Sequence, residues 1–226
     1  MTHQKILVWD LPVRIVHWLL AISFAGAFLT AESERFRDVH VAFGYTMLGL
    51  LAFRLLWGVL GTRYARFGSF AFGPRRVVAY LKSLIALKPQ HYIGHNPAGS
   101  WAIYAIFALI ATTAASGYAI FNDIGGGWLE ELHEGAANAL LGLVIVHVAG
   151  VIVSSVMHGE NLVRAMLTGY KTGEPRAAIR YKHRAVAAAL AAAVGAFWIS
   201  GGTDGLRSLD PQVRVARHEP AQERRE

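Results

Sequence analysis

Four histidines, at positions 17, 40, 133 and 147, lie within or at the ends of long apolar segments of the chain. His133 and His147 belong to the same segment and are 14 residues apart. In a helix that turns by ~100° and rises by ~1.5 Å per residue, this spacing places both imidazoles within ~40° of one face and ~21 Å apart. Two imidazoles that face each other in an apolar environment are typical axial ligands of a redox metal such as haem iron. This one segment therefore predicts two stacked ligand positions.

The composition limits the redox chemistry that these histidines can serve. The chain has no cysteine, which excludes disulfides, thiolate metal sites, iron–sulfur clusters and covalently attached haem. Its 226 residues are 54% hydrophobic and 16% charged, with a mean hydropathy of +0.35. Such a composition is typical of an integral membrane protein. The net charge of +7 gathers in particular loops, so we expect a membrane protein with lipid contacts and no nucleic-acid partner.

The histidines must be positioned by apolar segments that are long enough to cross a bilayer, which takes roughly 20 residues. The sequence predicts four spans and a marginal fifth, at residues 11–31, 39–60, 100–121, 133–157 and 185–200. The fifth segment would be ~24 Å long for a hydrocarbon core of ~30 Å. The expected fold is all-α and integral to the membrane: a four-helix transmembrane haem-binding bundle in residues 1–172, with a fifth C-terminal transmembrane helix and a polar tail in 173–226.

The charges of the loops orient the predicted spans. Residues 61–99 contain six basic residues and no acidic one, whereas residues 122–132 contain three acidic residues and no basic one. By the positive-inside rule, the N-terminus and the 61–99 loop lie in the cytoplasm. The expected location is the bacterial inner membrane, with several passes.

Residues 74–87 alternate basic and apolar side chains at helical spacing. This pattern predicts a helix that lies on the cytoplasmic leaflet or, equally, one that packs under the bundle.

The first predicted span is expected to remain in the protein and not to be cleaved as a signal peptide. Lys5 and Arg14 accompany an apolar run, as in signal peptides, but Asp10 and the length of the run are atypical. The distinction matters because cleavage would remove His17.

The depths of the four histidines match two by two. With the predicted topology, His17 and His147 both lie ~9 Å from the cytoplasmic surface, and His40 and His133 both lie at the outer edge. A haem iron with two histidine ligands has no open coordination position, which suits electron transfer. The sequence therefore predicts an inner haem held by His17 and His147 and an outer haem held by His40 and His133.

Any single histidine in a span also has simpler explanations, because it can hydrogen-bond a neighbouring helix or cap a helix end. The agreement of four depths favours ligation. His158 shares the face of His147 but lies ~16 Å beyond it, too far to pair at the level of His17. No role is assigned to the histidines in polar stretches, which are His3, His91, His183 and His218.

Arg54 is the one charge well inside a predicted span. It follows His40 by 14 residues, which places it on the same helix face and at the level of the inner haem. A charge inside a membrane is usually functional, so we expect Arg54 to bind a haem propionate. The alternative is that its side chain snorkels to the inner headgroups.

Other residues carry weaker signals. Arg63, Arg66 and His95 are candidates to neutralise propionates or a quinone oxygen, although an ordinary role as charges of a cytoplasmic loop is favoured. Four glycines in the second and fourth spans leave room for a flat macrocycle or, equally, for close helix packing. They are Gly44, Gly49, Gly135 and Gly142.

Several motifs resemble the bacterial cytochrome b561 family, which includes the b-type cytochrome subunits of nickel–iron hydrogenases. The matching features are His17-Trp18, the run from Arg54 to Phe67, the stretch Gly94-His95-Asn96-Pro97, the histidine pair of the fourth span, and residues 160–169. The resemblance covers residues 5–172. It implies two b haems ligated from the first, second and fourth spans, by His17, His40, His133 and His147. It also implies electron exchange with quinone and with a hydrogenase, a periplasmic dehydrogenase or a small cytochrome c.

Three functions remain open at this point. The leading one is a di-haem electron carrier between the quinone pool and a redox partner. The second is a quinone-linked oxidoreductase that acts by itself on a small substrate such as superoxide, although the mixed charges of the outer loops do not suit an anionic substrate. The third is a transporter or anchor without redox activity, which the absence of acidic residues well inside the spans disfavours.

Overall fold

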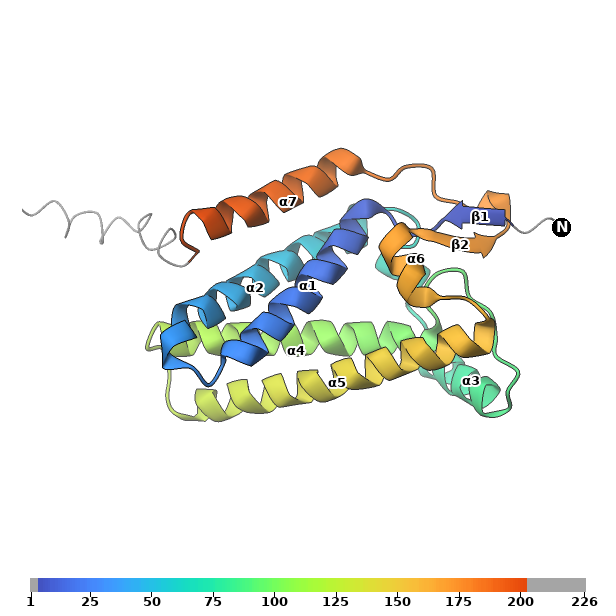
Figure 1. Ribbon diagram of the computed structural model, residues 1–226. Coiled ribbons are helices and arrows are strands. Elements are labelled where there is room, and N and C mark those ends of the chain that lie inside the picture. Colours follow the sequence, from blue (N-terminus) through green and yellow to red (C-terminus); the bar gives the residue numbers. More distant parts are fainter. Residues whose placement is uncertain (1–3, 203–226) are drawn as a thin grey trace, which may run out of the picture.

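The computed structural model describes residues 4–202 of the chain. The predicted polar tail beyond residue 202, His218 and His3 lie outside these described residues. In chain order, the helices are α1 (Leu11–Thr30), α2 (Arg37–Leu60), α3 (Pro74–Ile85), α4 (Pro97–Phe121), α5 (Trp128–His158), α6 (Leu162–Thr168) and α7 (Arg184–Ile199). Two short strands, β1 (Gln4–Leu7) and β2 (Tyr170–Gly173), lie together at one end (Figure 1).

Four helices, α1, α2, α4 and α5, are long and apolar enough to cross a membrane. The predicted integral membrane bundle with four spans is therefore confirmed. Helices α4 and α5 begin at Pro97 and Trp128, earlier than hydropathy indicated, because polar residues belong to their first turns. Asn96 caps α4 by accepting a hydrogen bond from the Gly99 N–H at 2.7 Å, and Glu130 and Glu131 lie in the first turn of α5, where the helix dipole favours acids.

The bundle packs through three helix pairs, α4 with α5, α1 with α2, and α2 with α4 (Figure 1). Its shared core is formed by Met47 and Leu51 of α2, Ile110 of α4 and Leu140 of α5. Many other large apolar side chains of the bundle are exposed, including Val146 and Val156 of α5 at 64% and 77%. Exposed apolar side chains are expected where lipid tails, and not water, surround a helix.

A second core forms where the residues before α1 meet the segment after α6. No pattern in the sequence predicts it. Strand β1 pairs antiparallel with β2, so the residues before α1 contact the segment after α6. Val8, Trp9 and Tyr64 are buried in the cluster beside this sheet. The Tyr64 hydroxyl donates to the carbonyl of Ala177 at 2.8 Å, and burial raises the pKa of Tyr64. The few residues ahead of the first span are thus part of the folded core.

Asp10 connects this second core to α1 and α2. The side chain is fully buried and caps α1 by accepting a hydrogen bond from the Val13 N–H at 2.9 Å. It also accepts from Trp57 Nε1 at 3.0 Å and from Thr62 Oγ1 at 2.6 Å. Three donors satisfy the carboxylate, as burial of a charge requires. In the sequence, Asp10 is distinguished only as a residue atypical of a signal peptide.

Helix α7 lies alongside α1 and α2 (Figure 1). At its start, the His183 ring is 5.1 Å from that of Trp57, and near its end Trp198 Nε1 donates to Thr46 Oγ1 at 3.1 Å. The helix therefore follows α2 from residue 57 back to residue 46. Its 16 residues make it shorter than the four spans, so the fifth transmembrane helix stays a prediction.

Helix α3 corresponds to the predicted amphipathic segment at residues 74–87. One side of α3 packs inward through the buried Tyr80, whose ring lies 5.8 Å from that of Tyr92. Burial raises the pKa of Tyr80. Other positions expose apolar side chains, of which Val78 and Ile85 are 51% and 83% exposed. The helix is thus packed on the protein and also has an apolar surface, and its contact with the leaflet stays a prediction.

We expect Gly169→Ala to destabilise the protein by roughly 1–3 kcal/mol. Gly169 has φ +88, and its carbonyl accepts from the N–H groups of Val8 and Trp9 at 2.9 and 3.1 Å. A Cβ atom would lie 2.7 Å from the Trp9 carbonyl oxygen, which is backbone and cannot move aside cheaply. Thermal unfolding in detergent measures the effect. Gly150→Ala is the matched control, because that Cβ would meet nothing within 4 Å, and an equal loss in both variants would contradict the prediction.

Candidate functional site

His17 and His147 face each other across the bundle from α1 and α5. Their ring centroids are 6.4 Å apart and their planes are inclined by 52°. Helices α1 and α5 are not among the closely packed pairs of the described chain, so the two rings meet across a gap between helices. Nδ1 of His17 is buried without a hydrogen-bond partner.

His40 and His133 face each other in the same way at the other end of the bundle, from α2 and α5. Their ring centroids are 6.1 Å apart and their planes are inclined by 70°. Both rings are oriented by backbone carbonyls. Nδ1 of His40 lies 2.8 Å from the carbonyl oxygen of Ala27, and Nδ1 of His133 lies 2.9 Å from that of Thr113. A proton on each Nδ1 leaves the Nε2 lone pair free for a metal.

The spacing of both pairs can be tested against an iron ion with two axial imidazoles. A metal–nitrogen bond of ~2.0 Å on each side places the two ring centroids on the order of 6 Å apart. The measured 6.4 and 6.1 Å fit this value. Nothing in the described residues forms a group of three or more histidine or acidic side chains that could hold a bare metal ion. The paired imidazoles suit a metal that brings its own equatorial ligands.

Helix α4 contributes residues around His133 that the sequence analysis missed. A Cβ at Gly117 would lie 2.9 Å from the His133 ring, so a larger residue there would displace the imidazole. Ser116 Oγ lies 3.3 Å from Nδ1 of the same ring. No periodicity distinguishes these small residues from ordinary packing positions, so the sequence carried no signal for them.

The glycines that were expected to make room lie in open surroundings. A Cβ atom at Gly44, Gly49, Gly135 or Gly142 would meet nothing within 4 Å. Close helix packing, the alternative explanation for these glycines, is therefore not their role at these four positions.

Arg54 is buried near the inner pair and does not snorkel to the surface, since only 5% of the residue is exposed. Its guanidinium carbon lies over the rings of Phe67 and Phe107, at 5.2 and 5.7 Å from their centroids. Nη1 is buried without a hydrogen-bond partner. A buried guanidinium with a free donor is suited to an anionic group that the protein itself does not supply.

His95 also lies in this aromatic cluster. Its ring is 4.3 Å from that of Phe70 and 4.7 Å from that of Trp9, and Nδ1 is buried without a partner. Burial, assisted by the charge of Arg54, lowers the pKa of His95 to about 3. The imidazole is thus neutral near pH 7, so it can donate a hydrogen bond to an acceptor but cannot neutralise an anion by its charge.

The remaining sequence candidates lie away from both pairs. Arg63 and Arg66 are exposed, and the Arg63 guanidinium lies 5.5 Å from the Tyr64 ring centroid, which favours their role as loop charges. Nδ1 of His158 lies 2.8 Å from the Ser154 carbonyl oxygen, and its ring lies 5.6 Å from that of His91.

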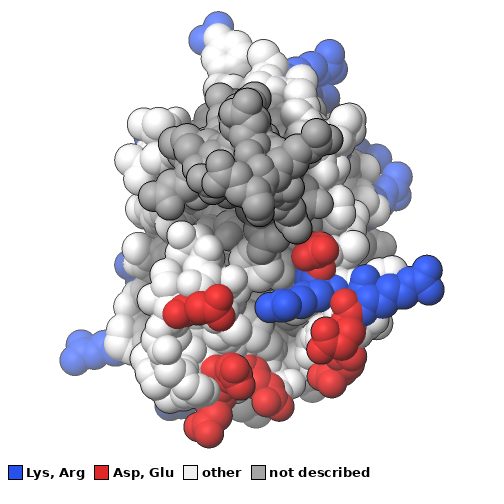
Figure 2. Space-filling model, turned by 90° about the vertical axis from the view of Figure 1, so that its left-hand side faces the viewer, with Lys and Arg blue, Asp and Glu red and all other residues white. Residues whose placement is uncertain are grey.

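The end of the bundle next to His40 and His133 carries mixed charges with an excess of acids (Figure 2). Its basic residues are Arg35 and Arg37. The acids around them are Glu32, Glu34, Asp38, Asp123, Glu130, Glu131 and Glu134. Such a surface does not concentrate small anions.

A four-helix membrane bundle with two facing histidine pairs and no cysteine defines a membrane cytochrome that binds its haem without covalent attachment. The chain belongs to the prokaryotic cytochrome b561 family, whose model matches residues 8–169. As a b-type cytochrome, it binds haem b and takes part in electron transfer in a bacterial membrane. A transporter or anchor without redox activity is therefore no longer an alternative.

The chain is also similar to proteins named as probable Ni/Fe-hydrogenase B-type cytochrome subunits. It is 24% identical to the one from Rhizobium leguminosarum bv. viciae, over 76% of this chain and 91% of that protein. Identity with the one from Cupriavidus necator is 25%, over 73% of this chain and 86% of that protein. Identity with the one from Azotobacter chroococcum mcd 1 is 30%, over 55% of this chain and 64% of that protein. No solved structure gives a significant match.

Proposed function

We propose that this protein holds two b haems at different depths of the membrane and carries electrons between the quinone pool and a redox partner. The proposal rests on the two facing histidine pairs, whose ring centroids are 6.4 and 6.1 Å apart. His17 and His147 would hold the inner haem, and His40 and His133 the outer one. Their levels on α5 are 14 residues apart, or ~21 Å along the helix.

Haem iron, when bound, accepts and releases one electron at a time. The protein's own residues would supply the imidazole nitrogens that hold the iron; they exclude water with apolar helices and orient the outer imidazoles through the carbonyls of Ala27 and Thr113. Two histidines on each haem would leave no coordination position for a substrate, which supports electron transfer and not chemistry at the iron.

Arg54 and His95 would bind a propionate of the inner haem. Both residues contact Phe70, with the Arg54 guanidinium carbon 6.0 Å and the His95 ring 4.3 Å from its ring centroid. Each has a buried nitrogen without a partner, and such atoms are rare in folded proteins unless a bound group satisfies them. Arg54 would supply the charge and His95 a neutral hydrogen bond.

A hydrogenase is the redox partner that the relatives' names suggest, since they are named as probable Ni/Fe-hydrogenase cytochrome subunits. The positive-inside rule supports a cytoplasmic N-terminus, which would place the outer haem and its acidic surroundings on the periplasmic side. Quinone would exchange electrons with one of the two haems. A partner that docks on the outer end would deliver or receive electrons at His40 and His133.

A reduced-minus-oxidised absorbance spectrum of the purified protein, with pyridine-haemochrome quantitation, tests the proposal. Two b haems per chain are expected. One haem would show that one histidine pair is not a ligand pair. No haem in a folded preparation supplied with haem would contradict the proposal.

We expect Arg54→Gln to lower the midpoint potential of the inner haem by on the order of 60 mV, or ~1.4 kcal/mol for one electron. Removal of a nearby cation destabilises the reduced iron, which carries one positive charge less than the oxidised iron. Potentiometric titration of the haem absorbance measures the shift. Arg66→Gln removes the same charge from an exposed loop position and should change neither potential; equal shifts in both variants would contradict the assignment.

A further inference from the structure

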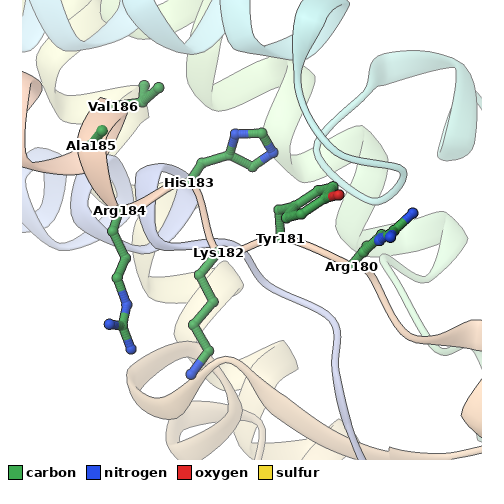
Figure 3. Close-up of a pocket in the computed structure, with 7 residues that line it drawn as sticks. All are labelled: Arg180, Tyr181, Lys182, His183, Arg184, Ala185 and Val186. Carbon is green, nitrogen blue, oxygen red and sulfur yellow. The ribbon is translucent and has the colours of Figure 1, made fainter.

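A hollow of about 640 Å³ lies at the start of α7 and is lined by residues 180–186 (Figure 3). Three of its residues, Arg180, Lys182 and Arg184, carry positive charge, and none is acidic. Tyr181 and His183 add aromatic rings. The hollow thus combines cations with aromatic side chains, the residue types that collect at the surface of a membrane.

The hollow lies where the ends of three helices meet. Helix α1 begins at Leu11, whose N–H donates to the carbonyl of Lys182 at 3.0 Å. The ring of His183, just before α7, is 5.1 Å from that of Trp57, near the end of α2. The ends of membrane-spanning helices lie at the level of lipid headgroups. The hollow therefore faces one headgroup layer, on the side of the loop that follows α2.

Lys182 of the hollow lies beside Tyr170 of β2. Lys182 Nζ lies 5.1 Å from the Tyr170 ring centroid, and in Figure 3 Lys182 and Arg184 extend to the same side of the chain. The hydrogen bond and the charge of Lys182 lower the pKa of the Tyr170 phenol, and the charges of Arg14 and Arg184 lower it further. Three cationic side chains thus act on one phenol.

No acid of the described chain neutralises these cations. Between residues 4 and 202, the ion pairs are Lys171 with Glu160 and Arg176 with Glu174, and neither involves a residue of the hollow. The first turn of α7 adds to the positive potential, because no side chain caps it. Like charges gathered without a counter-ion repel each other, so an anion bound among them would stabilise the arrangement.

We propose that the hollow binds the phosphodiester headgroup of one anionic phospholipid. Lys182 and Arg184 would contact the phosphate, with Tyr170, which lies beside Lys182, at the level of the glycerol. Basic hollows at the ends of transmembrane helices are known physical recognition sites for acidic lipids. This lipid site goes beyond the proposed electron transfer and does not depend on it.

Native mass spectrometry of the purified haem-loaded protein in detergent tests the site. The protein is titrated with phosphatidylglycerol or with phosphatidylcholine of the same acyl chains. One phosphatidylglycerol is expected to bind at least tenfold more tightly than phosphatidylcholine. The double variant Lys182→Gln, Arg184→Gln should lose this preference. The control, Arg75→Gln, Arg76→Gln, removes the same charge from exposed positions of α3 and should keep it.

Three results would overturn the lipid site. The first is equal affinity for the two lipids. The second is an equal loss of the preference for phosphatidylglycerol in the control variant, which would show that surface charge alone attracts the lipid. The third is a titration with inorganic phosphate in which phosphate displaces the lipid at equal concentration, because the ligand would then be free phosphate. The haem spectrum of each variant verifies folding, and lipid binding is counted separately from haem, so the two proposals can fail independently.

Discussion

Replacing His147 with alanine is expected to reduce the haem b content from two haems per chain to one. The ring of His147 faces only that of His17, 6.4 Å away, and the outer pair shares no residue with it. Loss of one axial ligand leaves the inner haem with a single histidine, and a non-covalently bound haem then dissociates readily on purification. Pyridine-haemochrome quantitation of the purified variant measures the content.

The matched control is His158→Ala, which removes a histidine from the same helix outside both pairs. Nδ1 of His158 lies 2.8 Å from the carbonyl oxygen of Ser154 one turn earlier, Nε2 lies 3.3 Å from that of Gln90, and the ring lies beside His91. This variant should keep both haems. His17→Ala should give the same spectrum as His147→Ala, whereas His133→Ala should lose the other haem. If His147→Ala kept two low-spin haems, the assignment of the inner pair would be wrong.

Asp10→Asn is expected to destabilise the protein by roughly 2–4 kcal/mol, because a buried network loses acceptors. The carboxylate accepts from Val13 N, Trp57 Nε1 and Thr62 Oγ1. An amide has one acceptor oxygen, so its NH₂ group would face a donor and leave it unpaired. The variant also removes the negative charge that lies near the buried Arg54.

Thermal unfolding in detergent, followed by helical circular dichroism, measures the effect of Asp10→Asn. Asp38→Asn is the control, because Asp38 is exposed in the first turn of α2 and contributes at most ~1 kcal/mol through the helix dipole. If the two variants melted at the same temperature, the buried network around Asp10 would not stabilise the fold as the structure indicates.

The membrane bundle and the histidine pairs could be predicted from the sequence because both depend on properties that are local along the chain. An apolar run of bilayer length requires a helix, since no water is available to satisfy the backbone. The period of the helix then converts the distance from His133 to His147 into two levels on one face. In the structure, His17 faces His147 and His40 faces His133. These are the two pairs that the depths predicted from the sequence indicate.

The surroundings of these histidines could not be predicted, because they arise from residues far apart in the chain. Gly117 leaves space for the ring of His133, which comes from the next helix. His95, counted from the sequence among loop charges, is enclosed by Trp9 and Phe70, and that enclosure makes it neutral. Neither residue differs from its neighbours in hydropathy or periodicity.

The sequence by itself determined that the chain crosses a membrane and that two pairs of imidazoles lie at matching depths, because hydropathy and helical period act over one segment at a time. Only the tertiary structure decided that β1 pairs with β2, that Asp10 joins α1 to α2, and that Lys182 lies over the ring of Tyr170. These arrangements depend on contacts between distant segments, whose burial and charge are set when the helices pack.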